Sequence, residues 1–118
     1  VVGIEFKQNN VIPIFKSLNK YQINFYDNGQ LYRLGYNSKN GSKHGEWIIY
    51  YESGEIKRED TYTNNQLNGL SSGWHKNGKK SHFHFYKKGE RDGIWQEWDE
   101  YGVRTSYQHY EDGERKAE

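Results

Sequence analysis

Three histidines offer the first candidate chemistry in this sequence. His82 and His84 stand two residues apart, so on a strand they share one face, and His75 precedes them across an expected turn. Three imidazoles can bind zinc. The chain has no cysteine to complete a ligand set, and Lys80 would place a cation beside the histidines. We therefore expect no metal and no cofactor, and interpret these histidines as surface or stacking residues.

Two carboxylates offer the second candidate chemistry. Glu97 and Asp99 also share a strand face, and a close pair of carboxylates can serve in acid–base catalysis. A simpler partner for Asp99 is Arg104, which we expect opposite it across a turn. The serines show no spacing with His and Asp residues that predicts a nucleophile. We therefore expect a protein without enzymatic activity.

Lysines and aromatic residues interleave between residues 74 and 88. Such a surface could stack single-stranded nucleic acid or meet anionic lipid headgroups. The pattern is confined to one segment, the segment that follows is acidic, and the net charge of the whole chain is only +1. We therefore expect no nucleic-acid partner, while a membrane surface rich in acidic phospholipid remains an alternative.

The histidines, carboxylates, lysines and aromatic residues named above belong to a sequence that repeats every 24 residues. Glycine recurs at Gly45, Gly69 and Gly93, and other glycines and aromatic residues follow the same spacing. Periods of this length are typical of arrays whose units bury apolar surface against their neighbours. Residues 1–19 fit the period poorly, and we expect them to form a degenerate hairpin that caps the array. The rest of the chain divides into four units: 20–44, 45–68, 69–92 and 93–118.

Each unit is predicted to be a β-hairpin. Apolar and aromatic runs flank a turn dipeptide, and Asn-Gly is the strongest short-range hairpin signal. The dipeptides are Asn28-Gly29, Ser53-Gly54, Asn77-Gly78 and Tyr101-Gly102. Two-residue turns there would set four opposite pairs: Tyr26 and Leu31, Tyr51 and Ile56, His75 and Lys80, Asp99 and Arg104. Between hairpins we expect five-residue connections, such as residues 65–69.

Alternation along the strands assigns two faces. One face is predicted to carry Trp47, Ile49, Tyr51, Ile56, Tyr62, Trp95 and Tyr110. The other is predicted to carry Phe25, Tyr50, Trp74 and Trp98, with Phe83, Phe85 and Tyr107 nearby. Because both faces are partly aromatic, one must be the packed interior of a curved or twisted sheet. The second face is then either half-buried or a binding surface.

Composition bounds the size and class of the protein. A chain of 118 residues suits one domain. Hydrophobic content is low at 32%, but 17% of the residues are aromatic and can hold a thin sheet together. No apolar run approaches the roughly 18 residues of a membrane span. We therefore predict an all-β fold, an elongated twisted antiparallel sheet of stacked hairpins. We also expect the chain to be soluble, and either cytoplasmic or exported after removal of a signal peptide.

Charge alternates from unit to unit although the whole chain is nearly neutral. Counting Lys and Arg against Asp and Glu gives +4 for residues 1–44, −3 for 45–68, +4 for 69–92 and −4 for 93–118. Neighbouring units of opposite sign attract one another, and such patterning favours one register along the stack.

The spacing of glycine, tryptophan and tyrosine resembles the MORN repeat, and more closely its bacterial variant form. The resemblance covers roughly residues 20–115, and its clearest motifs are Gly45-Glu46-Trp47 with Tyr50-Tyr51 and the step Gly41–Gly45. Ser71 stands where tryptophan is expected, and Asn65 where glycine is. The resemblance implies a sheet of stacked hairpins that acts as a scaffold or protein-binding module. It also implies links to acidic phospholipids and, for the bacterial variants, antitoxin or immunity roles.

We therefore expect a protein-interaction module, whose most specific form is an antitoxin or immunity partner of a bacterial toxin. Exposed Trp and Tyr dominate binding hot spots, so the expected binding surface is aromatic and basic. Its residues are Trp74, His75, Lys80, His82, His84, Tyr86, Trp95, Trp98, Tyr107 and Tyr110. The alternatives are an acidic phospholipid surface and a cell-wall glycan or choline, because aromatic ladders on an open sheet also suit sugars.

Overall fold

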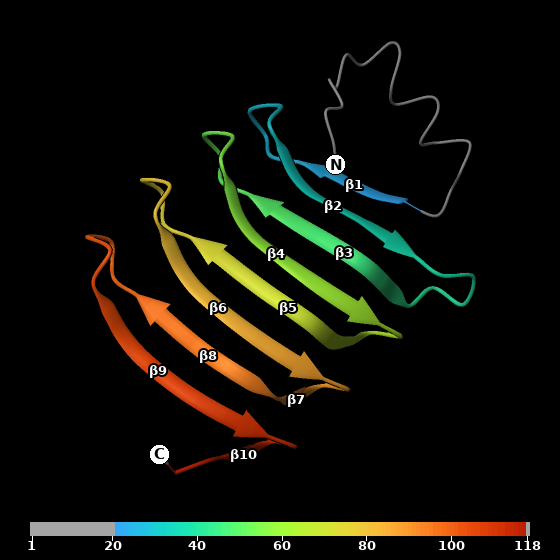
Figure 1. Cartoon of the computed structure of the whole chain (residues 1–118). Helices are drawn as coiled ribbons and strands as arrows, with labels where there is room; N and C mark the ends of the chain where they lie inside the picture. Colours follow the sequence, from blue (N-terminus) through green and yellow to red (C-terminus); the bar gives the residue numbers. More distant parts are fainter. Residues whose placement is uncertain (1–20, 118) are drawn as a thin grey trace.

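The computed structural model describes residues 21–117, which form ten strands and no helix (Figure 1). The strands are β1 (Tyr21–Phe25), β2 (Leu31–Asn37), β3 (Lys43–Tyr50), β4 (Ile56–Thr63), β5 (Gln66–Trp74), β6 (Lys80–Lys87), β7 (Glu90–Arg91), β8 (Gly93–Trp98), β9 (Arg104–Glu111) and β10 (Glu114–Arg115). They form one antiparallel sheet in the order β1-β2-β3-β4-β5-β6-β8-β9-β10, and β7 pairs with β6. The predicted cap over residues 1–19 lies outside the described residues.

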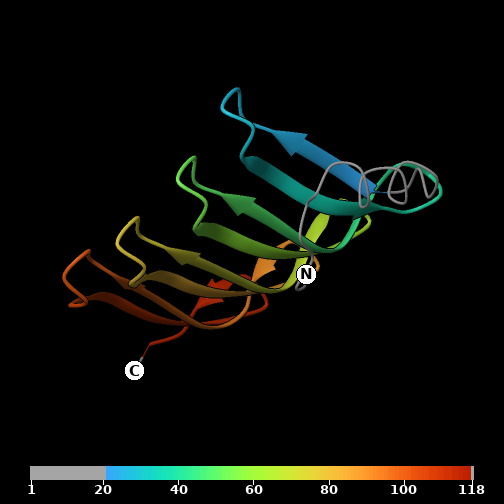
Figure 2. The same cartoon turned by 90° about the horizontal axis from the view of Figure 1, so that it is seen from above.

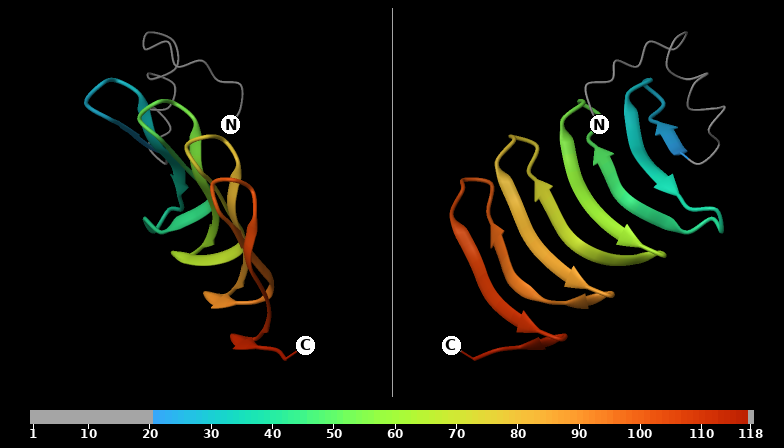
Figure 3. Two further views of the ribbon diagram at one scale, coloured as in Figure 1. Left: turned by 90° about the vertical axis from the view of Figure 1, so that its left-hand side faces the viewer. Right: turned by 45° about the vertical axis from the view of Figure 1, so that its right-hand side comes forward.

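The sheet is open and elongated, with successive hairpins side by side along its length (Figure 1). Its strands bend, and the hairpins turn relative to one another, so the described residues make one curved layer (Figure 2, Figure 3). The predicted all-β, elongated and twisted antiparallel sheet is therefore confirmed. None of the described residues belongs to a helix that could cross a membrane.

The hairpin turns are one residue longer than predicted. The N–H of Tyr51 donates to the carbonyl of Glu55 at 2.8 Å, and the N–H of Gly54 donates to the carbonyl of Tyr51 at 2.9 Å. This three-residue loop, with φ of 105° at Gly54, is a type I turn followed by a glycine bulge. As a result Ile56 lies opposite Tyr50, and the predicted pairing with Tyr51 is wrong.

The same correction applies to the other three hairpins, because each has the same turn. The observed pairs are Phe25 with Leu31, Trp74 with Lys80, and Trp98 with Arg104, in place of the predicted Tyr26 with Leu31, His75 with Lys80, and Asp99 with Arg104. A register shift follows each pair and restores the predicted register, so that Ile49 lies opposite Arg58. The body of each hairpin is thus paired as predicted, and only the turn differs.

Two of the three connections between hairpins are shorter than predicted, while the first, residues 38–42, has five residues. Thr63 lies opposite Gln66, so Asn64 and Asn65 alone form the turn, with φ of 49° and 69°. Asparagine tolerates this left-handed conformation, which the tightest hairpin turns require. The predicted five-residue connection at residues 65–69 is wrong, because all of it except Asn65 belongs to β5.

Strand pairing aligns side chains of neighbouring strands in rows that run across the sheet. Successive partners from β3 to β6 are Trp47, Asp60, Ser71 and His84, and Trp95 of β8 stacks on His84. We call the side that carries these five residues the Trp47 face. A neighbouring row on the other side runs through Leu34, Ile48, Glu59, Ser72, Phe83, Gln96 and Tyr107. We call that side the Leu70 face, after its residues Ile48, Leu70, Phe83, Phe85 and Tyr107.

The predicted division into faces holds except near the turns. The register places Trp47, Ile49, Tyr62, Trp95 and Tyr110 on the Trp47 face, as predicted. Ile56 instead pairs with Tyr50 on the Leu70 face, because the bulge shifts it by one residue. Tyr51 lies in the turn, and its hydroxyl donates to the carbonyl of Trp74 at 2.7 Å.

Side chains at the turns tie neighbouring hairpins together. The hydroxyl of Tyr26 donates to the carbonyl of Tyr50 at 2.6 Å. Tyr51, 25 residues further on, bonds the next hairpin in the same way. His75 follows after another 24 residues, and its Nε2 lies 2.9 Å from the carbonyl of Trp98, to which it donates. These hydrogen bonds link each hairpin to the next at the turn end of the sheet.

Candidate functional site

Trp47 anchors the Trp47 face in the second unit. Its indole is only 4% exposed, its Nε1 donates to the carbonyl of Tyr36 at 3.1 Å, and it covers Gly35 so closely that any side chain there would overlap the ring. The ammonium of Lys43 lies 4.9 Å from the indole and 5.0 Å from the ring of Tyr62. An indole, a cation and a tyrosine therefore form one cluster, which we call a tryptophan clamp.

Trp95 forms the corresponding clamp in the fourth unit. Its Nε1 donates to the carbonyl of Phe85 at 2.8 Å, and its ring stacks on His84 at 3.8 Å with an interplanar angle of 10°. The guanidinium of Arg91 lies 4.8 Å from the indole and 5.2 Å from the ring of Tyr110. The two clamps stand 48 residues apart in the sequence, which is two periods.

The third unit has no clamp, because Ser71 occupies the tryptophan position. Ser71 is fully buried, and its hydroxyl donates to Oδ1 of Asp60 at 2.6 Å. The other carboxylate oxygen of Asp60 accepts from Nε of Arg58 at 2.8 Å. On its far side, the Ser71 oxygen lies 3.1 Å from Nε2 of His82. We call this chain of four residues the polar network.

The polar network contains Ser, His and Asp but is not arranged for nucleophilic catalysis. In a catalytic triad the histidine lies between the other two residues and takes the serine proton. Here Ser71 lies in the middle and its O–H donates a hydrogen bond to Asp60, so its oxygen can only accept a hydrogen bond from His82. Ser71 is also 0% exposed and Asp60 5% exposed, so no substrate carbonyl can reach them. This arrangement stabilises buried polar groups by pairing them.

Burial keeps the two histidines of the sixth strand neutral near pH 7. Burial and, to a smaller extent, the neighbouring His84 together lower the pKa of His82 to about 4. Burial also lowers the pKa of His84, although its hydrogen bond to Glu97 at 3.1 Å opposes the shift. The two imidazoles lie 4.5 Å apart, and His84 continues the stack to Trp95. They serve as packing groups on the Trp47 face.

The structure separates the three histidines considered as zinc ligands. His82 and His84 share the Trp47 face as predicted, while His75 lies in a turn and bonds the carbonyl of Trp98. Across residues 21–117, no group of three or more His, Cys, Asp or Glu side chains is placed to hold a metal ion. The paired carboxylates also separate: Glu97 meets His84, and Asp99 accepts from the turn N–H groups of Tyr101 and Val103.

The Leu70 face exposes apolar side chains in the third and fourth units. Leu70 is 46% exposed and lies opposite Phe85, and Tyr107 is 45% exposed. Two cations lie beside the aromatic rings here. The ammonium of Lys80 is 5.5 Å from the ring of Phe83, and the guanidinium of Arg104 is 4.7 Å from the ring of Tyr107. Neither cation forms an ion pair with another described residue, so their charge is available to a ligand.

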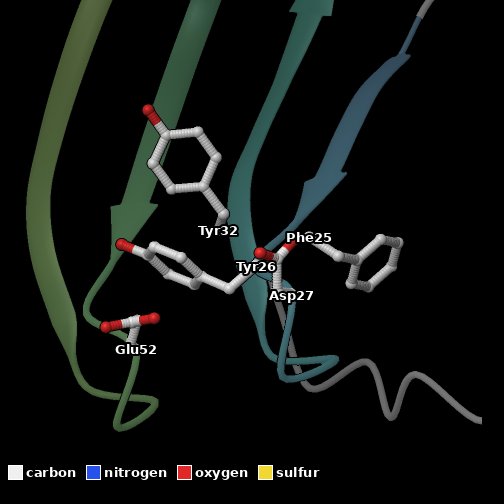
Figure 4. A pocket seen from close by; sticks show the side chains of 5 residues that line it. All are labelled: Phe25, Tyr26, Asp27, Tyr32 and Glu52. Atoms are coloured by element: carbon white, nitrogen blue, oxygen red, sulfur yellow. The ribbon is translucent and has the colours of Figure 1, made fainter.

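Shallow hollows lie along the turn end of the sheet. One, of about 420 Å³, is lined by Phe25, Tyr26, Asp27, Tyr32 and Glu52. Figure 4 shows that the ring of Phe25 points away from the two tyrosines, so the aromatic rings do not enclose a common space. The hydroxyl of Tyr26 is already bonded to the carbonyl of Tyr50. A second hollow, of about 440 Å³, has polar walls that include His75 and Glu100. These hollows lack the enclosure typical of a small-molecule site.

The ten residues predicted to bind a partner do not form one surface. Five lie on the Trp47 face, where they are buried or half-buried: His82, His84, Tyr86, Trp95 and Tyr110. Four lie on the Leu70 face: Trp74, Lys80, Trp98 and Tyr107. His75 lies in a turn. Only the second group shares a face with exposed apolar side chains.

Two groups of functional interest were missed by sequence reasoning. Asp60 and Ser71 belong to different units, and the predicted five-residue connection concealed that their strands pair. Leu70 follows a glycine and precedes two serines, so it resembles part of a polar connection. A two-residue Asn64-Asn65 turn was the available signal, because it extends both strands and sets Asp60 opposite Ser71.

Comparison of the chain with protein-family models, with curated proteins and with solved structures returned no match. The resemblance to MORN repeats therefore remains a prediction from the spacing of residues.

Proposed function

We propose that this chain is a non-enzymatic repeat module that binds another protein through the Leu70 face of its third and fourth units. The observation that carries the proposal is the exposure of Leu70 and Tyr107 on a face that also presents the cations Lys80 and Arg104. Exposed apolar groups within a polar rim are typical of protein-binding surfaces. A partner with apolar and acidic side chains would complement this face.

The shape of the face favours a protein over a small molecule. A small ligand needs a concave site that covers most of its surface, whereas stable protein interfaces bury roughly 800 Å² on each partner. The Leu70 face belongs to a single open layer, and the two hollows described above lie at the turns. Aromatic residues and arginine, which dominate interface hot spots, are present at Phe83, Tyr107 and Arg104.

The polar network supports the non-enzymatic part of the proposal. Its serine is buried and donates to Asp60, so it has no nucleophilic role in this arrangement. The resemblance to bacterial variants of the MORN repeat adds a more specific form of the proposal, in which the partner is a toxin and this chain neutralises it.

An affinity capture from lysate of the source organism tests the proposal. The bait is the whole chain, compared with the double variant Leu70→Thr and Phe83→Thr, which keeps strand-forming residues but removes the apolar surface. The matched control is Phe25→Thr, because Phe25 is 41% exposed but lies in β1, outside the third and fourth units. We expect one protein that the wild type and the control retain and the double variant loses. Thermal unfolding checks that all three chains are folded.

Other outcomes would contradict the proposal. If capture falls most with Phe25→Thr, the captured proteins adhere to exposed apolar surface in general and not to the Leu70 face of the third and fourth units. Flotation with vesicles that contain acidic phospholipid, lost at high salt, would favour the membrane reading if no protein is captured. Retention on choline or cell-wall glycan resin would favour the sugar reading in the same way.

A further inference from the structure

Two cations occupy equivalent positions on the Leu70 face, 24 residues apart in the sequence. Lys80 begins β6 and Arg104 begins β9. The ammonium of Lys80 lies 5.5 Å from the ring of Phe83, and the guanidinium of Arg104 lies 4.7 Å from the ring of Tyr107. Arg104 also donates to the neutral side chain of Gln96 at 3.1 Å. Contacts with aromatic rings therefore define where each cation lies on the face.

The fold does not require cations at these two positions. The corresponding residues of the first and second units are apolar, Leu31 and Ile56, and Leu31 is only 7% exposed. Both pair with an aromatic residue beside the same kind of turn, as Lys80 and Arg104 do. Because an apolar residue serves equally well in the hairpin, the charge on the third and fourth units indicates a role in binding.

No acidic side chain of the described residues forms an ion pair with either cation. Glu97 of β8 lies on the Trp47 face, and Asp99 accepts from N–H groups of its own turn. Glu100 lines one of the two hollows, and Glu59 shares the Leu70 face but belongs to β4, two strands from β6. These strands thus present positive charge here, although the fourth unit as a whole carries −4.

The spacing of the two cations selects the shape of a ligand. β8 lies between β6 and β9, so two strand spacings of about 4.8 Å, roughly 10 Å in all, separate the two strands. Seven residues of an α-helix rise about 10.5 Å, and residues seven positions apart share one helix face. Along an extended chain, residues on one side recur about every 6.7 Å, which does not match. A helix that crosses the strands can therefore set one acidic side chain on each cation.

The surface between the two cations is aromatic. β8 ends at Trp98, between the starts of β6 and β9, and Phe83 and Tyr107 lie one row further from the turns. One helical turn rises about 5.4 Å, close to the strand spacing, so residues three and four positions after the first acidic residue would face Trp98. Apolar residues at those helix positions would cover rings that are now only partly buried.

We propose that the Leu70 face of the third and fourth units binds an amphipathic α-helix of the partner protein, which lies across β6, β8 and β9. Two acidic residues seven positions apart meet Lys80 and Arg104, and the apolar residues between them pack on Trp98. Arg104 can hold its carboxylate with two hydrogen bonds, whereas Lys80 acts as a point charge. This inference rests on the function proposed above and names the charge and shape of its partner.

Synthetic peptides test the spacing on the whole chain. The probe is a fluorescent, alanine-based helical peptide of about 18 residues, with two glutamates seven positions apart and leucines three and four positions after each. In the matched peptide the second glutamate stands five positions after the first, which turns it away from the sheet. Fluorescence anisotropy at low salt measures both affinities. We expect the first peptide to bind at least about tenfold more tightly.

Charge reversal on the protein assigns the contacts. Lys80→Glu and Arg104→Glu should each weaken binding of the first peptide about tenfold. Lys88→Glu makes the same change in an exposed turn at the other end of β6, and should leave binding unchanged. Two further peptides carry lysine in place of one glutamate or the other. One should restore binding to Lys80→Glu and the other to Arg104→Glu, which shows that the variants are folded and gives the direction of the helix.

Several outcomes would overturn the proposal. They are equal binding of the two glutamate peptides, no measurable binding of either, tighter binding of an extended peptide in which glutamate and threonine alternate, and tighter binding to vesicles of acidic phospholipid. The capture experiment above separates this failure from failure of the proposed function. A captured protein that depends on Leu70 and Phe83, but that the helical peptide does not displace, would support the Leu70 face and reject the helix.

Discussion

The second and third units place different residues in the same position of the same sheet. In the second unit Trp47 fills it with an indole that lies on Gly35. In the third unit Ser71 fills it, and the residue that corresponds to Gly35 is Asp60, which accepts a hydrogen bond from the serine hydroxyl. One position therefore holds a large ring over a residue with no side chain, and the other a small hydroxyl beside a carboxylate.

The difference shows that neighbouring residues compensate for each other across strands. A second tryptophan at 71 would meet the side chain of Asp60, and a glycine at 60 would leave Ser71 without a partner in a buried site. The fourth unit supports this reading, because Trp95 returns and stacks on a flat imidazole, His84. In all three units this row is packed, whereas the exposed apolar side chains Leu70 and Tyr107 lie on the Leu70 face, the surface that we propose for binding.

The largest effect is expected from removing an indole. Trp47→Ala should lower the free energy of unfolding by about 3–5 kcal/mol, because it leaves a cavity and an unpaired carbonyl at Tyr36. Urea unfolding measures it. Trp74→Ala is the matched control, since Trp74 is only half-buried, and should cost clearly less. Equal losses would mean that the clamp does not dominate the packing of the sheet.

A methyl group at Gly35 tests how tightly the indole is held. Gly35→Ala should cost about 3 kcal/mol, because the new Cβ overlaps the ring of Trp47, which is enclosed. Gly73→Ala makes the same change beneath His82, whose ring is only half-buried, and should cost less. In the background of Trp47→Ala, the cost at Gly35 should nearly vanish. A cost that persists there would place the strain in the backbone instead of the clamp.

Breaking the polar network should have a smaller effect. Asp60→Ala leaves the buried hydroxyl of Ser71 and the guanidinium of Arg58 without their acceptor, and should cost about 2 kcal/mol in urea unfolding. Ser71→Ala in that background should then be nearly neutral, because the donor is removed with its acceptor. Two independent, additive losses would show that the four residues do not act as a network.

The smallest effect is a dependence of stability on pH that arises at His82. Its pKa is about 4 in the folded chain and about 6.5 when unfolded, so the unfolded chain takes up the proton first as pH falls. Stability should therefore fall between pH 6.5 and 4, by about 1 kcal/mol after allowance for the partial exposure of the ring. The measurement compares urea midpoints of the wild type and His82→Gln at pH 7 and 4.5. If the urea midpoint falls by the same amount from pH 7 to 4.5 in both proteins, the pH dependence of stability arises from other groups.

Much of the sheet follows from spacing alone, because glycine and aromatic residues every 24 positions require repeated strands and turns. The body of each hairpin pairs as predicted, with Ile49 opposite Arg58. The turns could not be placed to the residue, since Ser53-Gly54 permits both a two-residue and a three-residue loop. Serine has little tolerance for positive φ, and this preference decides for the longer loop with only Gly54 left-handed.

The site was less predictable than the fold. Whether Trp95 or Tyr107 faces a partner depends on which side of a single layer is packed, and aromatic residues occur on both sides. Burial resolves the question: Trp95 is buried with its N–H bonded, whereas Tyr107 is exposed. The pairing of Asp60 with Ser71 depends on β4 and β5 lying side by side, and the misread connection at Asn65 concealed it.

Leu70 and Ser71 are adjacent in β5 and point to opposite faces, so one pair of variants tests the central claim most directly. Unfolding free energy and affinity for the captured partner are measured on Leu70→Thr and Ser71→Ala. We predict that Leu70→Thr weakens binding at least about tenfold with stability almost unchanged, and that Ser71→Ala lowers stability by about 1–2 kcal/mol with binding unchanged. The reverse outcome, in which Ser71→Ala abolishes binding while Leu70→Thr retains it, would contradict the account.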